Sequence, residues 1–315
     1  GLDIAAAMCK SAAQALKIAA NDVVVASTGV IGQPLPLGPI KDAMPALAAW
    51  LSTGGSGDAA EAIMTTDTKR KQVAVRFPIG DKLCTIGGIA KGSGMIHPNM
   101  ATMLCFVTTD ADIAPELLQK ACKDVADETF NMISVDGDTS TNDMLAILAS
   151  GAAANEPIKS LGKEYYHFQQ GLMIVCRRLA RELAADGEGA TKLLECAVTG
   201  APDCQTAKKV AKSVICSSLF KAAMFGGDAN WGRVLCAIGY TDAEFDVSRV
   251  GVTLSSAAGS VPVCSNGAGV PFSEEQAAKI LAQPEIRIEI DMAQGGETAT
   301  AWGCDLTYDY VKING

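Results

Sequence analysis

Stretches typical of β-strands alternate with amphipathic helical stretches along most of the chain, and this alternation constrains the fold most strongly. The segment "QVAVRFPIG" places Val73, Val75 and Phe77 on one face, as a half-buried strand does, and "KLCTIGGIA" follows as its expected hairpin partner. Because several strands are expected to be antiparallel, we predict a layered α+β fold rather than a doubly wound parallel sheet.

The other expected elements continue this alternation to the end of the chain. Ser273 is a candidate N-cap, with Gln276 three residues later to complete a capping box. A change in character near residue 155 suggests two domains, 1–155 and 156–315. Helices are expected at about 4–18, 41–51, 114–133, 160–185, 204–224 and 273–281, and strands at about 23–26, 102–109, 143–150, 192–198, 234–240, 246–255, 285–292 and 298–306, with a helix as the alternative at 143–150.

Composition and charge exclude several classes of protein. Hydrophobic residues make up 49% of the chain and charged residues 19%, which is typical of a globular protein. A net charge of −9 argues against a nucleic-acid partner, and no apolar stretch is long enough for a membrane span. The 11 cysteines are scattered singly, so we expect buried thiols in a reducing compartment, without disulfides or a zinc site. With only His97 and His167, a His-rich metal site is excluded.

The segment "KGSGMIHPNMATML" carries the candidate nucleophile. A glycine-rich turn leads to the small residue Ala101 and then to Thr102, which opens an apolar run. A threonine hydroxyl is a poor nucleophile unless a base takes its proton, and an N-terminal threonine has its own α-amino group for this purpose. Self-cleavage between Ala101 and Thr102 would create that terminus. The alternative is an ordinary strand that begins with a β-branched residue.

Three further loops contain residues that are suited to chemistry. In "ASTGVIG" the Thr28 hydroxyl and the Gly29 amide are two donors that could stabilise an oxyanion, although a plain loop has the same pattern. The run "SVDGDTSTND" does not match a calcium loop, and a turn that hydrogen-bonds its own backbone explains it equally well. Glu188, between two glycines in "DGEGATK", is expected to be an exposed turn carboxylate.

Together these motifs resemble one family. The chain is similar to ornithine acetyltransferase, also described as the bifunctional glutamate N-acetyltransferase of arginine biosynthesis. The resemblance covers nearly all 315 residues and follows the family's order. It rests on "ASTGVIGQPLP", "MTTDT", "AKGSGMIHPNMATML", "SVDGDTSTNDM", "GEGATK", "GGDANWGR" and "DLTYDYVKIN".

The resemblance implies a role for each matching residue. Thr102 would be the nucleophile, freed by cleavage of the Ala101–Thr102 bond, and Thr28 and Gly29 would hold the oxyanion. The implied fold is a sandwich of helices flanking two central sheets, which resembles the N-terminal-nucleophile hydrolases but is connected differently. The residues expected to contact substrate are Thr65, Lys91, Thr102, Glu188 and Asn314.

The resemblance also implies substrates and partners. The acetyl group would pass from N-acetylornithine to glutamate, with ornithine released, without a metal or cofactor, and acetyl-CoA would be an alternative donor. We expect Lys91 to bind the carboxylate of the amino acid and Glu188 its ammonium group. The family implies a heterotetramer of two copies of each cleavage product, in the cytoplasm or, in a eukaryote, in an organelle matrix.

Three alternatives stay open. An aminopeptidase or amidase of a related self-cleaving fold would use water in place of glutamate. A member of the same family could serve a secondary-metabolite pathway. A non-catalytic relative or an unprocessed structural subunit would not cleave at all.

Overall fold

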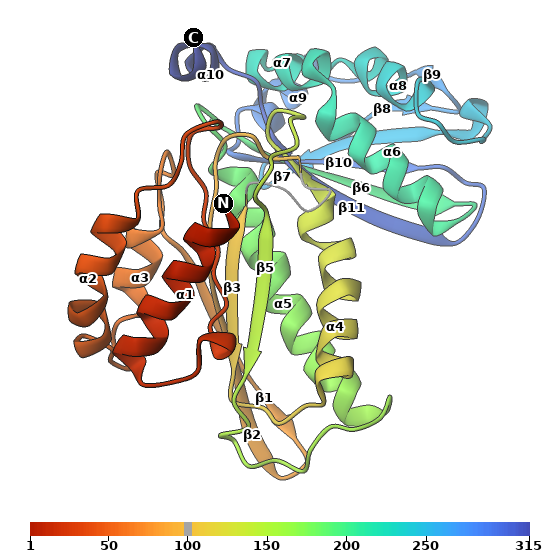
Figure 1. The fold of residues 1–315 in the computed structure, drawn as a ribbon. Coiled ribbons are helices and arrows are strands. Elements are labelled where there is room, and N and C mark those ends of the chain that lie inside the picture. Colours follow the sequence, from red (N-terminus) through yellow and green to blue (C-terminus); the bar gives the residue numbers. More distant parts are fainter. Residues whose placement is uncertain (98–102) are drawn as a thin grey trace. The chain divides into compact units, whose positions relative to one another are not determined.

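The computed structural model describes residues 1–97 and 103–315, and the chain forms two compact units, Gly1–Ile63 and Met64–Gly315 (Figure 1). The boundary expected near residue 155 lies inside the second unit, where α5 (Lys163–Ala185) packs along strands from the first half of the chain. The expectation that 1–155 carries the nucleophile and the oxyanion hole, and that 156–315 contributes substrate contacts, stays a prediction.

The first unit is helical. It contains α1 (Leu2–Leu16), the short η1 (Ala20–Asp22), α2 (Leu37–Ala49) and α3 (Ser56–Ala62), and α1 packs against α2. The strand expected at 23–26 is absent, so that prediction was wrong. A strand needs a neighbour with which to exchange main-chain hydrogen bonds, and this unit contains no strand. Val24, in the middle of this segment, is instead 58% exposed.

The second unit begins with a four-stranded sheet. Val73, Val75 and Phe77 lie on one face of β1 and pack against the core, so the half-buried strand and its hairpin partner are confirmed. The hairpin and the next pair are antiparallel, whereas β3 and β5 are parallel. Among the described residues the strand order is β1 (Lys71–Ile79), β2 (Lys82–Lys91), β3 (Leu104–Thr109) and β5 (Met144–Ala149).

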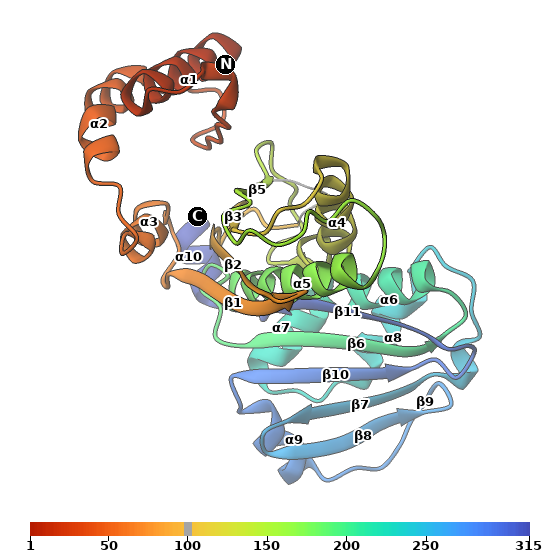
Figure 2. The ribbon, with the colours of Figure 1, turned by 90° about the horizontal axis from the view of Figure 1, so that it is seen from below.

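A seven-stranded mixed sheet follows in the same unit (Figure 2). Residues of β10 alternate strictly between exposed and buried, so one face of this sheet is covered and the other is open. The pairs β4–β11 and β6–β10 are parallel, and the other pairs are antiparallel. Within the described part of the chain the order is β4 (Ile133–Ser134), β11 (Glu297–Cys304), β6 (Leu193–Ala201), β10 (Glu285–Asp291), β7 (Gly251–Ser256), β8 (Gly259–Ser265) and β9 (Ala268–Gly269).

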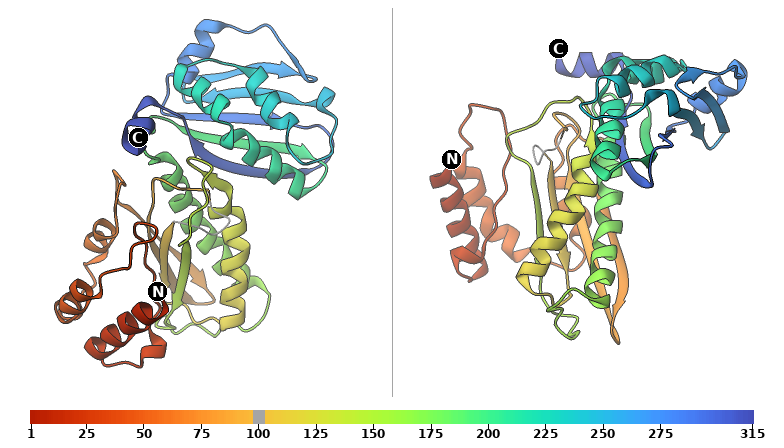
Figure 3. Two further views of the ribbon diagram at one scale, coloured as in Figure 1. Left: turned by 45° about the horizontal axis from the view of Figure 1, so that its top comes forward. Right: turned by 90° about the vertical axis from the view of Figure 1, so that its right-hand side faces the viewer.

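Helices flank both sheets, as the left view of Figure 3 shows for α6 across the larger one. α5 packs on β1 and β2 and also contacts β11 and β4, α4 lies beside α5, and α6 packs on β11 and β6. This arrangement confirms the α+β class with two helix-flanked sheets, and the likeness to N-terminal-nucleophile hydrolases stays a prediction. Besides α5 the helical segments are α4 (Pro115–Glu128), η2 (Phe130–Met132), α6 (Cys204–Cys216), α7 (Ser218–Gly226), α8 (Trp231–Gly239), η3 (Val247–Arg249), α9 (Glu274–Leu281) and α10 (Tyr308–Asn314).

Two predictions in the second half are corrected. The segment 234–240, expected as a strand, belongs to α8, because the Asn230 side chain accepts a hydrogen bond from the Arg233 amide and so begins a helix. The helix expected over 204–224 is two helices that meet at Ser217. The predicted cap of α9 is confirmed, since Ser273 accepts from the amide of Gln276.

Candidate active site

The expected site residues fall in three parts of the chain. Thr65, Lys91, Glu188 and Asn314 lie in the second unit. Thr28 and Gly29 lie in the loop after η1, in the first unit, so their role as oxyanion donors stays a prediction. Ala101 and Thr102 lie outside the described residues, and their roles in cleavage and catalysis also stay predictions.

Lys91 is a buried cation at the end of β2. Its side chain is 4% exposed, and its ammonium group makes no hydrogen bond or ion pair with a described residue. Burial lowers the pKa of Lys91, while the negative charges of Asp67, Asp143 and Glu188 oppose that shift. A buried ammonium group without a hydrogen-bond acceptor is unfavourable unless an anion binds to it. This part of the site is therefore suited to a carboxylate.

Glu188 lies in the turn that follows α5. Its amide donates to the carbonyl of Ser93 at 2.9 Å, which joins the turn to the loop after Lys91. Its carboxylate lies against Gly94, because a Cβ atom added there would be 2.5 Å from the Glu188 carboxyl carbon. The half-buried carboxylate is thus held near Lys91 rather than free in solvent as the sequence suggested.

The C-terminal helix brings Asn314 to the same place. The Asn314 amide nitrogen donates to Glu188 Oε2 at 2.8 Å. The helix α10 is docked on the Glu188 turn, because the Thr307 hydroxyl donates to the Gly189 carbonyl at 2.7 Å and also accepts from the Tyr310 amide. Burial, together with the nearby carboxylates of Asp136, Asp138 and Glu188, raises the pKa of Tyr310 to about 12. Sequence reasoning did not predict this helix, although Thr307 is a suitable N-cap.

Thr65 is connected to this cluster through the main chain. Its amide donates to Asp67 Oδ2 at 3.1 Å, and Asp67 Oδ1 accepts from the Gly92 amide at 2.7 Å. The adjacent Thr66 hydroxyl is 2.6 Å from the Ser93 hydroxyl. The structure therefore brings together four predicted substrate residues, which are Thr65, Lys91, Glu188 and Asn314.

The polar run "SVDGDTSTND" supplies two carboxylates to the surroundings of this site. Asp136 accepts from the amides of Met95 and Ile96 and so holds the glycine-rich loop. Asp143 accepts from the amide of Met103, the residue directly after Thr102. Its other oxygen, Oδ2, is buried and has no hydrogen-bond partner among the described residues. Burial raises the pKa of Asp143 to about 7, although the Met103 amide and Lys91 oppose the shift.

His97 lies beside a buried serine. Its Nδ1 lies 3.1 Å from the hydroxyl of Ser134, which is fully buried. Burial, together with the charge of Lys212, lowers the pKa of His97 to about 4, so the imidazole is neutral at physiological pH. We assign His97 a packing role.

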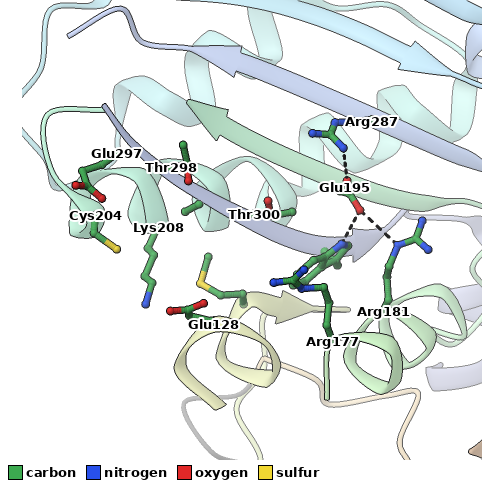
Figure 4. A pocket seen from close by; sticks show the side chains of 13 residues that line it. Glu128, Arg177, Arg181, Glu195, Cys204, Lys208, Arg287, Glu297, Thr298 and Thr300 are labelled. Atoms are coloured by element: carbon green, nitrogen blue, oxygen red, sulfur yellow. Dashed lines mark hydrogen bonds and ion pairs between the residues drawn. The ribbon is translucent and has the colours of Figure 1, made fainter. Parts of the chain in front are cut away.

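A cavity of about 620 Å³ lies elsewhere, along β11 and β6 of the seven-stranded sheet (Figure 4). It contains none of the predicted site residues. Glu195 pairs with two of the arginines that line it: it accepts from Arg287 at 2.9 Å and lies 3.4 Å from Arg181, and it also accepts from the Trp302 indole at 2.8 Å. We therefore place the candidate active site at Lys91 and Glu188 rather than at this cavity.

Comparison with known proteins identifies the family. A family model described as the ArgJ family matches residues 1–315. The chain belongs to the ArgJ family. A protein of Symbiobacterium thermophilum named arginine biosynthesis bifunctional protein ArgJ is 53% identical over all 315 residues, and the match covers 77% of that protein. A protein of Clostridium acetobutylicum named arginine biosynthesis bifunctional protein ArgJ 1 is 50% identical, with the same coverage.

A solved structure agrees with this membership. The crystal structure of arginine biosynthesis bifunctional protein ArgJ from Bacillus halodurans is 44% identical and superposes with a TM-score of 0.62. The match covers 66% of this chain and 97% of that one. The resemblance seen in the motifs is therefore confirmed at the level of the family.

Two findings concern metals and membranes. Within residues 1–97 and 103–315, no group of three or more His, Cys, Asp and Glu side chains could hold a metal ion. No helix of this described part has the length and apolar composition that a membrane crossing requires. The expectation that the protein needs neither a metal nor a cofactor stays a prediction.

Proposed function

We propose that this protein is an acetyltransferase of arginine biosynthesis that moves the acetyl group from N-acetylornithine to glutamate. Membership of the ArgJ family and the names of the relatives support the pathway. The observation that carries the substrate class is the buried Lys91, whose ammonium group has no hydrogen-bond partner in residues 1–97 and 103–315, together with the nearby carboxylate of Glu188. These opposite charges complement the carboxylate and the ammonium group of an amino acid.

The proposed chemistry uses Thr102 as the nucleophile. Cleavage of the Ala101–Thr102 bond exposes the α-amino group of Thr102, whose ordinary pKa of about 7.7–8.0 suits a base at neutral pH. The hydroxyl attacks the acetyl carbonyl of N-acetylornithine and gives its proton to this amine. Thr28 and Gly29 stabilise the oxyanion, the amine of ornithine leaves with a proton, and Thr102 keeps the acetyl group as an ester. The amine of glutamate then attacks the ester carbonyl, the bond to the Thr102 oxygen breaks, that oxygen takes up the proton lost by the amine, and N-acetylglutamate is released.

Intact mass under denaturing conditions tests self-cleavage. We expect two species that correspond to residues 1–101 and 102–315, and a single 32.5 kDa species for Thr102→Ala. Thr102→Ser, which keeps a hydroxyl, is expected to cleave. A single species in the unaltered protein, with no acetyl transfer, would favour a non-catalytic relative.

Steady-state kinetics test the acetyl-enzyme. The reciprocal of the initial velocity is plotted against the reciprocal of the N-acetylornithine concentration, at several fixed glutamate concentrations. Two-stage transfer gives parallel lines in this plot, whereas a ternary complex gives intersecting lines. Glutamate-dependent formation of N-acetylglutamate distinguishes a transferase from an amidase, which would release acetate at the same rate without glutamate. Profiling other N-acetylated amines distinguishes a member that serves a secondary-metabolite pathway.

Charge changes test the zwitterion hypothesis. Lys91→Glu and Glu188→Lys each place like charges together, and the neutral pair Lys91→Met and Glu188→Gln serves as the matched comparison. Because a hydrogen bond to a charged group contributes about 1.5–3 kcal/mol, we expect the KM for ornithine in the reverse direction to rise about tenfold or more. An unchanged KM in both charge-reversed variants would exclude these pairings.

Other expectations are tested in the same preparation. Because the relatives are named bifunctional proteins, acetyl-CoA is proposed as a second acetyl donor, and its consumption in the presence of glutamate measures this activity. A native mass of twice the sum of both fragments would support the heterotetramer.

A further inference from the structure

A buried cluster of three charges is hydrogen-bonded to the segments that carry the candidate active site. Lys71, at the start of β1, is 1% exposed, and its Nζ lies 2.6 Å from Asp67 Oδ1 and 2.6 Å from Asp186 Oδ2. Removing an ammonium group from water costs several kcal/mol, so such a residue persists only with well-placed partners. Here both partners are carboxylates, so the cluster of one ammonium group and two carboxylates has a net charge of −1.

Asp67 connects this cluster to two of the substrate residues. Besides the lysine it accepts hydrogen bonds from the amides of Gly92 and Thr65, at 2.7 and 3.1 Å. Burial raises the pKa of Asp67, but the bonds from Lys71 and the Gly92 amide outweigh that effect and lower it. The charged carboxylate therefore holds the main chain directly after Lys91 and at Thr65.

Asp186 connects the same cluster to a third substrate residue. It lies at the end of α5, two residues before Glu188, and it accepts from the amides of Thr68 and Lys69 at 3.0 and 3.3 Å and from the Thr68 hydroxyl. The Glu188 amide donates in turn to the Ser93 carbonyl, which joins this segment to the loop after Lys91. Three segments that are distant in sequence are thus held together through one lysine.

We infer that Lys71 is a positioning residue for the substrate site, acting through Asp67 and Asp186 to hold Thr65, Lys91 and Glu188 in place. The inference rests on the proposed function, since it assumes that these three residues bind substrate. The negative charge of Asp67 also opposes the effect of burial on Lys91 and so favours its charged form.

A contribution to stability alone does not explain why charged residues occupy these buried positions. Replacing a buried ion pair by apolar residues of similar volume is often neutral or stabilising. Apolar side chains, however, cannot accept the amide hydrogen bonds of Thr65, Thr68, Lys69 and Gly92, which would then be unpaired. The charges are therefore suited to fixing the positions of main-chain segments.

Lys71→Met tests the inference because it keeps an unbranched side chain, one atom shorter, and removes its charge. We expect the KM for N-acetylornithine to rise about tenfold or more, with a smaller change in kcat, and faster hydrogen exchange at the Gly92 and Thr65 amides than in the unaltered protein. Lys212→Met is the matched control, since Lys212 is also a largely buried lysine but donates to the carbonyls of Asn131 and Ile133. It is expected to leave KM and exchange at these amides unchanged.

Failure of the positioning role of Lys71 can be distinguished from failure of the proposed function. A folded Lys71→Met protein with an unaltered KM and unaltered exchange at Gly92 and Thr65 would overturn the inference, even if its melting temperature fell. If Lys71→Met does not fold, Lys71→Arg decides, because it keeps the charge with a different geometry. A raised KM then supports positioning, and an unchanged KM overturns it. Absence of acetyl transfer in the unaltered protein would contradict the proposed function instead, and hydrogen exchange would still report on the positions of these amides.

Discussion

Individual residues set the charge and shape of the candidate site. The Glu188 carboxylate can lie where it does because residue 94 has no side chain, and its negative charge opposes the effect of burial on the pKa of Lys91. The amides of Thr65 and Gly92 are held by one carboxylate, that of Asp67. Small changes at these positions should therefore alter substrate binding more than stability.

Gly94→Ala is expected to displace the Glu188 carboxylate. The new Cβ atom would lie 2.5–2.6 Å from the carboxyl group, which is the flexible end of a side chain and can move. We expect a melting temperature close to that of the unaltered protein and a KM for ornithine about tenfold higher, because a charge-assisted hydrogen bond is lost. Gly296→Ala is the control, since a Cβ atom there has no neighbour within 4 Å. Equal KM values for the two variants would contradict the placement of Glu188.

Asp143→Asn is expected to change how stability depends on pH. The pKa of Asp143 is about 7 in the folded protein and 3.8 ordinarily, so between these values the folded state binds a proton that the unfolded chain has lost. The free energy of unfolding contributed by this group therefore falls as pH rises from about 4 to 7. Asparagine keeps an oxygen that can accept from the Met103 amide. Because it does not titrate, it causes no fall in the free energy of unfolding between these pH values.

Urea unfolding at pH 5 and pH 8 measures this difference. At pH 8 we expect Asp143→Asn to be more stable than the unaltered protein by on the order of 1 kcal/mol, a modest value because the carboxylate is only partly buried. At pH 5 we expect a smaller difference between the free energies of unfolding of the two proteins. A difference that is the same at both pH values would contradict the shifted pKa.

At the scale of elements, local signals predicted most helices and strands but failed where caps or partners decide. The apolar run near 234–240 suits a strand or a helix equally, and the Asn230 cap selects the helix. The segment 23–26 has β-branched residues but no strand in its unit to pair with. Hydrophobic periodicity continues through Ser217, so it cannot show that the chain turns there.

Ser217→Ala tests why one predicted helix is two. Ser217 has an extended backbone, with φ −69° and ψ 107°, and its hydroxyl accepts from the Phe220 amide at 3.3 Å. Loss of such an N-cap typically destabilises a protein by about 1 kcal/mol, so we expect a fall of about that size in chemical denaturation. Ser218→Ala is the control, because Ser218 is exposed in the first turn of α7. Similar effects from both substitutions would contradict the capping role.

At the scale of the whole molecule, the second unit has one continuous hydrophobic core beneath two sheets, and most cysteines belong to it. Cys84, Cys105, Cys176, Cys196, Cys264 and Cys304 are buried, and all 11 cysteines are free. Burial raises the pKa of the Cys105 and Cys196 thiols, which further lowers their reactivity. These six cysteines thus behave as small hydrophobic residues, as the sequence context indicated, whereas Cys204 and Cys236 are exposed.

A thiol reagent measures this burial directly. In the native protein we expect a fast phase equivalent to two thiols, from the exposed Cys204 and Cys236, and 11 thiols after denaturation. Cys204→Ser and Cys236→Ser should each remove about half of the fast phase. A fast phase that also includes buried cysteines would show that the core opens readily.

The sequence by itself determined the family, the α+β class, the β1–β2 hairpin and most residues of the candidate site. These features depend on short motifs and on local periodicity, which a linear sequence displays. Only the tertiary structure revealed that Asp186 joins Lys71 and Asp67 and that Asn314 docks on Glu188, because Asp186 lies 115 residues from Lys71 and Asn314 lies 126 residues from Glu188. Their pairing depends on burial and on Coulomb attraction across a folded core, and neither can be read from spacing along the chain.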